Sequence, residues 1–114
     1  LELISFFSER LAAARKAGIN DVILDPGFGF AKNHEQSFEL LNNLELFDVL
    51  DAPLLVGISR KSMIYKTLDA TPAEALNGTT ALNTIALLKG AWILRVHDVK
   101  EAVECVKLIQ KVLP

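Results

Sequence analysis

Polar residues able to bind a ligand follow three apolar runs of this chain, each directly at the end of its run. The runs at residues 22–24, 54–58 and 92–94 lead into Asp25, into residues 59–62 and into residues 95–97. Parallel strands separated by helices place their carboxyl ends on one face, where the catalytic residues of α/β barrels collect. We therefore expect these polar residues to form one site for an anion or a flat heterocycle.

Asp25 precedes a loop in which Gly27 and Gly29 allow a ligand to approach the backbone, while Phe28 and Phe30 offer flat aromatic surfaces. A carboxylate here could accept two hydrogen bonds from an amidine-like edge, such as that of a pterin or guanine. The alternative is that Asp-Pro-Gly simply makes a turn, which is the commoner role of this tripeptide.

The second polar group, Ser59, Arg60, Lys61 and Ser62, combines two cations with two hydroxyls at the end of an apolar run. Lys61 could hydrogen-bond a ring carbonyl or brace a leaving group at such a strand end. The alternatives are a solvated surface cation for Lys61 and a structural ion pair for Arg60.

Arg95 and His97 stand two residues apart, so in an extended strand their side chains project to the same side. A guanidinium that binds bidentately and an imidazole that adds a donor suit a phosphate or diphosphate. The alternative is an Arg95 satisfied by a core carboxylate and a His97 that caps a helix. We expect Asp98 to cap the following helix and His34 to lie on the surface.

The elements that position these residues alternate along the chain. We predict strands at residues 22–25, 54–58 and 92–96. We predict helices from residue 3 to Gly18, from Asn33 to before Pro53, from Thr71 to Lys89, and from Asp98 onward, with a short helix over residues 61–68. The strand ends recur about every 35 residues, close to the roughly 31 residues of a βα unit in a (β/α)8 barrel.

Composition supports this α/β class and limits the partners. The chain has 114 residues, 51% of them hydrophobic, and a net charge of −2. Such apolar content favours strands buried on both faces, and the charge argues against nucleic acid as a partner. The single cysteine, Cys105, which we expect to be a packing residue, favours a cytoplasmic setting. No apolar stretch reaches the length of a membrane helix, so we expect no membrane partner.

Three parallel strands are too few to close a barrel, and an open sheet of three would expose its edges. We therefore expect either that the chain is part of a longer protein or that another chain supplies the missing strands.

Three segments, at residues 24–32, 56–62 and 95–101, together resemble dihydropteroate synthase, an enzyme family of the folate pathway. All three occur in the family's order and spacing. The resemblance implies that residues 1–114 are the C-terminal part of a (β/α)8 TIM barrel, a segment of a single pterin-binding domain whose N-terminal strands are absent here. It implies an enzyme that condenses 4-aminobenzoate with 6-hydroxymethyl-7,8-dihydropterin diphosphate and releases diphosphate and 7,8-dihydropteroate.

The resemblance also implies roles for individual residues at the pterin. Asp25 would bind the amidine edge of the pterin, and Lys61 would contact the pterin as well. Arg95 would lie beside the pterin and bind the diphosphate together with His97. Lys61, Arg95 and His97 would thus be the catalytic residues.

The aminobenzoate pocket would be formed with the help of Lys61 and lined by Phe30 and Ser62. The family's Mg²⁺ ion takes its ligand from the absent N-terminal part, so we expect no metal ligand in this segment. The resemblance further implies a homodimer, and a segment that is inactive by itself.

Two alternatives remain open beside this interpretation. A pterin-binding methyltransferase of the related barrel type would share the Asp at the pterin edge but has no diphosphate to release, so the pair Arg95 and His97 favours the synthase. A non-catalytic half-barrel would stabilise a partner or an oligomer, and the retention of Asp25, Lys61, Arg95 and His97 argues against that.

Overall fold

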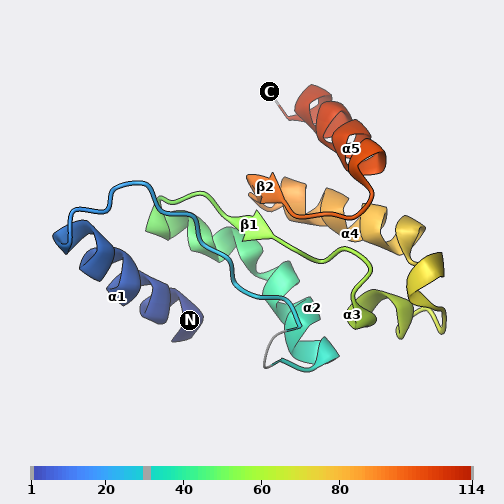
Figure 1. Ribbon diagram of the computed structural model, residues 1–114, viewed down its shortest axis with the longest axis horizontal. Helices are drawn as coiled ribbons and strands as arrows, with labels where there is room; N and C mark the ends of the chain where they lie inside the picture. The colour runs from blue at the N-terminus through green and yellow to red at the C-terminus, as the bar shows by residue number, and fades with distance from the viewer. Residues whose placement is uncertain (1, 30–31, 114) are drawn as a thin grey trace.

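The structure, a computed structural model, describes residues 2–29 and 32–113. It is an α/β arrangement, mostly helical, with a short parallel sheet at its centre (Figure 1). The elements in chain order are α1 (Glu2–Lys16), α2 (His34–Asn42), the 3-10 helix η1 (Leu44–Leu50), β1 (Leu55–Val56), α3 (Ser62–Tyr65), the 3-10 helix η2 (Pro72–Glu74), α4 (Leu76–Leu88), β2 (Ile93–Leu94) and α5 (Val99–Val112).

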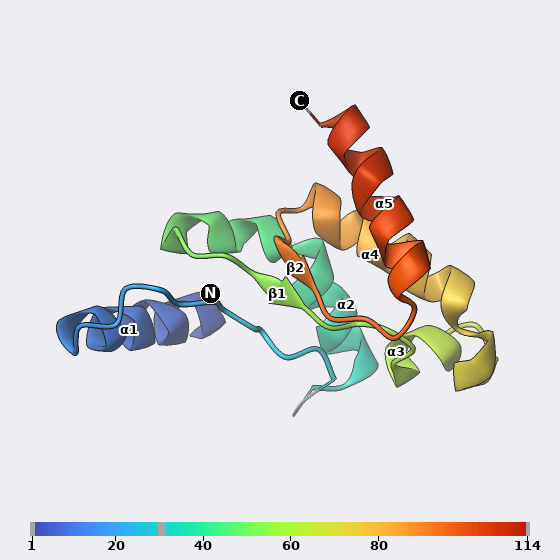
Figure 2. The ribbon, with the colours of Figure 1, turned by 45° about the horizontal axis from the view of Figure 1, so that its top comes forward.

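The sheet joins β1 to β2 in parallel, with Leu55 opposite Ile93. Leu24 is joined to Leu54 by an isolated parallel bridge, so a third segment runs beside β1 on its other edge. The two strands lie side by side in both ribbon views (Figures 1 and 2). The predicted parallel direction is therefore confirmed.

The predicted strand lengths are wrong. Residues 22–25 contribute one bridge in place of a strand, and β1 and β2 have two residues each, although the runs at 54–58 and 92–96 were predicted as strands throughout. The outer edges of Leu24 and β2 have no paired strand among residues 2–29 and 32–113. Because a ladder needs hydrogen-bonding partners, pairing persists only where the three segments face one another.

Helix α1 follows its predicted apolar stripe. Leu11 is buried, Leu3 and Phe7 pack against the core, and the helix is followed by Gly18 in the left-handed conformation at φ +88°. The Phe7 ring lies 5.9 Å from that of Phe47 in η1, centroid to centroid. This contact attaches α1 to the rest of the molecule.

Helix α2 begins with the predicted capping box. The Asn33 side chain accepts the backbone N–H of Gln36, and the Gln36 side chain accepts that of Asn33, at 2.8 and 3.0 Å. The prediction of one helix up to Pro53 is wrong, because α2 ends at Asn42 and η1 follows. Asn43 leaves helical geometry at φ −108° and donates its side-chain N–H to the Glu39 carbonyl, a local bond that competes with helix continuation.

The predicted helix from Thr71 to Lys89 is also divided. Thr71 and Glu74 form the predicted capping box, but they cap the short η2, and α4 starts only at Leu76. The break lies at Ala75, which is fully buried and has φ −91° and ψ 7°. The short helix predicted over residues 61–68 is confirmed as the four residues of α3.

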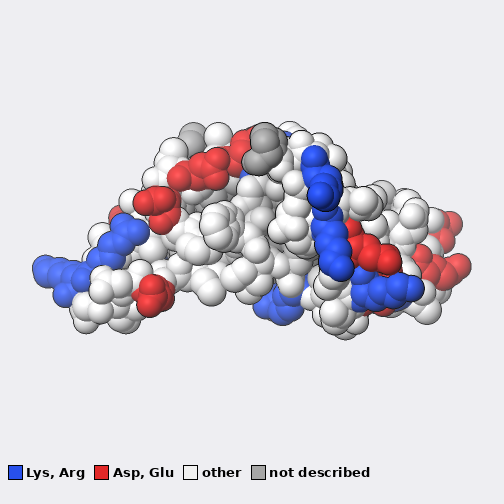
Figure 3. Space-filling model, turned by 90° about the horizontal axis from the view of Figure 1, so that it is seen from above, with Lys and Arg blue, Asp and Glu red and all other residues white. Residues whose placement is uncertain are grey.

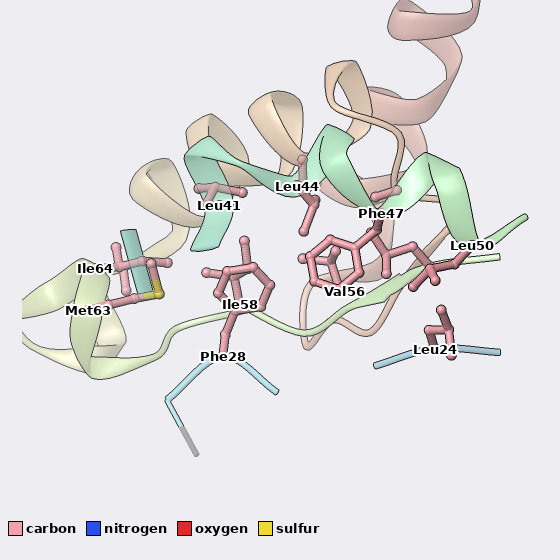
Figure 4. Close-up of a cluster of buried hydrophobic side chains, with 14 of the residues drawn as sticks. Leu24, Phe28, Leu41, Leu44, Phe47, Leu50, Val56, Ile58, Met63 and Ile64 are labelled. Carbon is pink, nitrogen blue, oxygen red and sulfur yellow. The ribbon is translucent and has the colours of Figure 1, made fainter. Parts of the chain in front are cut away.

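The core lies between β1 and the helices α2, η1 and α3 (Figure 4). Phe28 from the loop before α2 is 1% exposed and approaches Ile58, which is fully buried after β1. The labelled core residues are Leu24, Phe28, Leu41, Leu44, Phe47, Leu50, Val56, Ile58, Met63 and Ile64. The loop at the end of the first apolar run is thus anchored by its own aromatic side chain.

Helix α5 packs on α4 rather than on the sheet core. Cys105 is buried there, as predicted for a packing residue, and its Sγ lies 3.1 Å from Oγ1 of Thr84. Helix α5 also borders an apolar groove of about 1080 Å³ that includes Leu94 and Val103. Trp92, at the same groove, is 78% exposed.

Figure 3 views the molecule from the side on which α5 rises in Figure 1. A broad area between the charged bands carries no Lys, Arg, Asp or Glu there. Within the part of the chain that the structure describes, no helix combines the length and apolarity needed to cross a membrane.

Gly78 of α4 packs closely against Ile64 of α3. A Cβ at this position would collide with Cγ2 of Ile64 and lie 3.2 Å from Cδ1 of Leu68. We expect Gly78→Ala to lower the free energy of unfolding by about 1–2 kcal/mol, because overpacking exceeds the helix propensity gained by alanine. Urea denaturation measures the change.

Asn77→Ala is the matched control, since Asn77 is the exposed neighbour of Gly78 on the same helix turn. It should leave stability unchanged or slightly raised. A Gly78→Ala variant as stable as Asn77→Ala would contradict the close packing of α3 on α4.

Candidate functional site

The ends of the three parallel segments bring Asp25 and Arg95 together. The Arg95 backbone N–H donates to the Val56 carbonyl at 3.0 Å, which places Arg95 beside the end of the middle strand. Its Nη1 then lies 3.4 Å from Oδ2 of Asp25, on the far segment. The arginine side chain therefore crosses the middle strand to reach the aspartate.

Gly57 makes this crossing possible. A Cβ at Gly57 would lie 2.6 Å from Nη2 of Arg95 and 3.0 Å from Cζ, so the guanidinium rests on the glycine backbone. Any other residue would force the arginine to move, because real Cβ atoms do not approach so closely. The glycine of the second apolar run thus has a specific role at the site.

The two carboxylate oxygens of Asp25 have different surroundings, one in a turn and one facing Arg95. Its Oδ1 accepts the N–H of Gly27 at 2.9 Å, so Asp-Pro-Gly does form a turn. Its Oδ2 faces Arg95, and the side chains of Asp25 and Arg95 are 36% and 54% exposed. The turn holds the carboxylate in place while leaving it open to a ligand.

Arg95 was expected within a buried strand, but it follows β2 and is exposed. It therefore needs no core carboxylate, and an exposed pair such as this one is weak. An anionic ligand can compete for the guanidinium.

Ser59 holds His97 through two hydrogen bonds, at the same small cavity as Arg95. Ser59 is 5% exposed, and its Oγ lies 2.8 Å from Nδ1 of His97 and accepts the His97 backbone N–H at 3.2 Å. The imidazole is exposed, and with Nδ1 engaged its Nε2 is the nitrogen available to a ligand. The sequence pattern predicts no separate role for Ser59, although a small hydroxyl at the end of a buried run is a usable signal.

Lys61 lies between two cavities. One, of about 110 Å³, is lined by Gly57, Ser59, Lys61, Arg95, Val96 and His97. The other, of about 440 Å³, is lined by Phe28, Gly29, Lys32, Asn33, His34, Lys61, Ser62 and Met63. The structure therefore brings together the strand-end residues predicted from the sequence, with Lys61 at their junction.

The Lys61 ammonium is anchored and perturbed. Its Nζ donates to the Phe28 carbonyl at 2.6 Å. Partial burial lowers the pKa of Lys61, the charge of Arg95 lowers this pKa further, and Asp25 opposes the shift. A lysine with a lowered pKa in a cleft, beside groups of both signs, is typical of a binding or catalytic site.

The loop after Asp25 is braced by a second lysine. Nζ of Lys32 donates to the carbonyls of Pro26 and Gly27, at 3.0 and 3.1 Å. Phe30, predicted to line the aminobenzoate pocket, lies outside the described residues.

Arg60 is structural, as one of the sequence alternatives predicted. It adopts φ +54°, and its guanidinium holds Asp98 through two bonds of 2.9 and 3.0 Å. It also donates to the carbonyls of Pro72 and Ala73. These bonds join η2, the turn after β1 and the start of α5.

Asp98 was predicted to cap α5 with its side chain, and this is wrong. It stands at the N-cap position, but its carboxylate makes no capping bond because both oxygens bind Arg60. The Arg60 guanidinium lowers the pKa of Asp98 through these hydrogen bonds.

His34, expected on the surface, lies instead within the larger cavity. It is half-buried, and its Nε2 lies 2.9 Å from Oγ of Ser62. No local pattern reveals this contact, because the two residues are 28 positions apart and meet only through the packing of α2 on α3.

Metal ligands do not gather in the described part of the chain. No group of three or more His, Cys, Asp or Glu side chains is arranged there to hold a metal ion. The carboxylate at the site, Asp25, already faces a guanidinium.

The sequence matches the model of the pterin binding enzyme family over residues 2–97. It is 46% identical to the dihydropteroate synthase of Escherichia coli over 114 residues, which are 98% of this chain and 40% of that protein. The chain thus spans about two-fifths of the length of the curated relatives it matches.

Solved structures agree with this comparison. A 7,8-dihydropteroate synthase from Vibrio fischeri is 47% identical and superposes with a TM-score of 0.90, covering 98% of this chain and 42% of that one. A Yersinia pestis enzyme with a pterine-sulfa conjugate is 41% identical with a TM-score of 0.93, covering 97% of this chain and 45% of that one.

We predict opposite shifts of the Lys61 pKa for two substitutions of neighbouring charged residues. Asp25→Asn should lower the pKa of Lys61 further, because it removes an attraction, whereas Arg95→Gln should raise it, because it removes a repulsion. NMR titration of ¹³C-labelled lysine side chains measures both, with exposed Lys66 as the internal control. Shifts in the same direction would show that these charges do not act on Lys61 as the geometry requires.

The bond between Arg60 and Asp98 predicts a pH-dependent stability. The folded pKa of Asp98 is lowered, so the pair stabilises the fold above the pKa of an unfolded aspartate, and this contribution disappears as pH falls through the folded value. Arg60→Gln should therefore lower the Tm most at pH 7, with a smaller deficit at acidic pH.

Lys89→Gln removes an ion pair with Glu45, which is 54% exposed, together with a bond from Nζ to the Asn42 carbonyl, and serves as the control. Any loss of Tm in this variant should be similar at both pH values, because the exposed ion pair contributes little. A deficit of Arg60→Gln that is independent of pH would mean that the carbonyl bonds alone account for the stabilisation by Arg60.

Proposed function

The chain belongs to the pterin binding enzyme family, and from this membership we propose that the protein of which it forms part is a dihydropteroate synthase. It would condense 6-hydroxymethyl-7,8-dihydropterin diphosphate with 4-aminobenzoate to give 7,8-dihydropteroate and diphosphate. The observation that carries this proposal is the convergence of Asp25, Lys61, Arg95 and His97 at neighbouring parallel strand ends.

The pterin would be recognised by Asp25. Oδ1 of Asp25 accepts the backbone N–H of Gly27. Among the described residues, Oδ2 makes only the weak, exposed ion pair with Arg95. The 2-amino and ring N–H groups of a pterin are donors that suit an ionised carboxylate. Binding would replace the Arg95 contact and release the guanidinium for the diphosphate.

Departure of the diphosphate would be assisted by Arg95 and His97. The bond between the exocyclic methylene carbon of the pterin and the diphosphate oxygen breaks, and the oxygen leaves with the electron pair. The Arg95 guanidinium and an N–H donor of His97 stabilise the developing negative charge. The amino nitrogen of 4-aminobenzoate then bonds to that carbon and loses a proton, so no covalent nucleophile on the protein is needed.

The 4-aminobenzoate would occupy the larger cavity, beside Ser62. Lys61 borders both cavities and would contact the pterin on one side and the aminobenzoate pocket on the other. No Asp or Glu side chain lines the larger cavity among the described residues, which suits a carboxylate ligand. Positioning of the two substrates contributes to rate by making their encounter intramolecular.

A Mg²⁺ ion would take part, as the resemblance to the family implies. Among the described residues, no group of three or more His, Cys, Asp or Glu side chains is arranged to hold a metal ion. Its protein ligand would come from the remainder of the full-length protein, and no step above depends on its position.

The full-length protein would complete a (β/α)8 barrel, of which residues 1–114 are the C-terminal segment of a single domain. In support, the chain spans 40% of its E. coli relative, and β2 has no further paired strand among the described residues. The segment alone would be inactive, since it lacks the other wall of the site. We further propose a homodimer, for which the exposed apolar residues Leu88 and Leu108 of α4 and α5 are suitable.

One feature of the site favours the synthase over a pterin-binding methyltransferase, and another favours it over a non-catalytic half-barrel. Arg95 and His97 border one cavity and suit an anion that a methyltransferase does not release. A non-catalytic half-barrel would have no need of a lysine whose pKa is lowered beside Arg95.

The test is a diphosphate-release assay on the full-length protein with both substrates. We expect turnover by the wild type, none by residues 1–114 alone, and a loss of about 100-fold or more in Lys61→Met, because a cation at the reacting centre is removed. Lys66→Met removes an exposed lysine of the following helix end and should retain activity. A wild-type protein that binds neither pterin nor 4-aminobenzoate would refute the function.

A further inference from the structure

We propose that His34 is a positioning residue for 4-aminobenzoate, acting through the hydroxyl of Ser62. The proposal rests on the synthase function above and deepens it, because it concerns a histidine that borders the aminobenzoate cavity and contacts its predicted lining residue. The carrying observation is the 2.9 Å contact between His34 Nε2 and Ser62 Oγ.

The position of His34 is fixed by the start of α2. His34 is the first residue of this helix, directly after the cap residue Asn33, whose capping box with Gln36 holds the first turn. The contact joins this turn to the first residue of α3, Ser62. Helices α2 and α3 lie beside each other in the ribbon views (Figures 1 and 2). The imidazole thus reaches Ser62 from a backbone that is itself held.

Two residues on one face of α2 contact the two walls of the cavity of about 440 Å³. His34 and Ser37 are three residues apart and so share a face of the helix. Ser37 is fully buried, and its Oγ accepts the N–H of Gly29 at 3.2 Å, which secures the loop wall. His34 secures the opposite wall at Ser62. Leu41, four residues after Ser37, is buried in the core and anchors this face.

The effect of this contact is orientational. A serine hydroxyl can occupy three rotamers, and a hydrogen bond to His34 selects one of them. Ser62 then presents its remaining hydrogen-bonding capacity to the cavity of about 440 Å³ in a constant direction. Loss of the bond should weaken binding of the aryl substrate by about twofold to tenfold, the range for one net hydrogen bond.

The test uses steady-state kinetics of the full-length protein with three variants of His34. The amide of His34→Gln can reach the place of Nε2, whereas that of His34→Asn matches Nδ1 and falls short of Ser62. We expect a higher KM for 4-aminobenzoate in His34→Leu and His34→Asn, rescue in His34→Gln, and an unchanged KM for the pterin diphosphate in all three. Circular dichroism confirms that each variant is folded.

A double-mutant cycle with Ser62→Ala separates positioning from a merely structural role. If His34 acts through Ser62, adding His34→Leu to Ser62→Ala should raise the KM no further. An additive effect, or an unchanged KM in His34→Leu, would overturn the inference while leaving an active synthase. A wild-type protein without activity would overturn the proposed function and this inference with it.

Discussion

Parallel pairing of three short segments is the constraint on which the site depends. Leu55 donates its N–H to the Leu24 carbonyl at 2.7 Å, and Trp92 donates to the Leu54 carbonyl at 2.9 Å. These bonds set the segments in register, so the polar residues after each of them emerge at one face. The ladder is short, but Val56 and Ile58 are fully buried and hold it against the helices.

Neighbouring cations of the turn after β1 have different tasks. Arg60, in the left-handed conformation, joins the turn to Asp98, while Lys61 points to the cavities on the other side. The turn is thus held by one cation, while the next is partly buried with its Nζ bound to the Phe28 carbonyl. The lowered pKa of Lys61 is a consequence of that placement. Gly57 completes the arrangement by admitting the Arg95 side chain over the strand.

Features that depend on interactions between residues close in sequence were predicted correctly. The apolar stripe of α1 and the capping box at Asn33 follow from periodicity and short-range bonds, and both were correct. Strand lengths were not predictable, because ladder bonds depend on segments distant in sequence. The contacts of Asp98 with Arg60 and of His34 with Ser62 likewise arise from tertiary packing. The strand-end residues were predictable because one topology places all such ends together.

A structure of the full-length protein with a bound pterin tests the central claim most directly. The account predicts that the amidine edge of the pterin binds the Asp25 carboxylate, and that the Arg95 guanidinium leaves its position 3.4 Å from Asp25. Lys61 should lie between the pterin and the cavity that contains Ser62. A pterin bound elsewhere, with Asp25 and Arg95 still paired, would contradict the account.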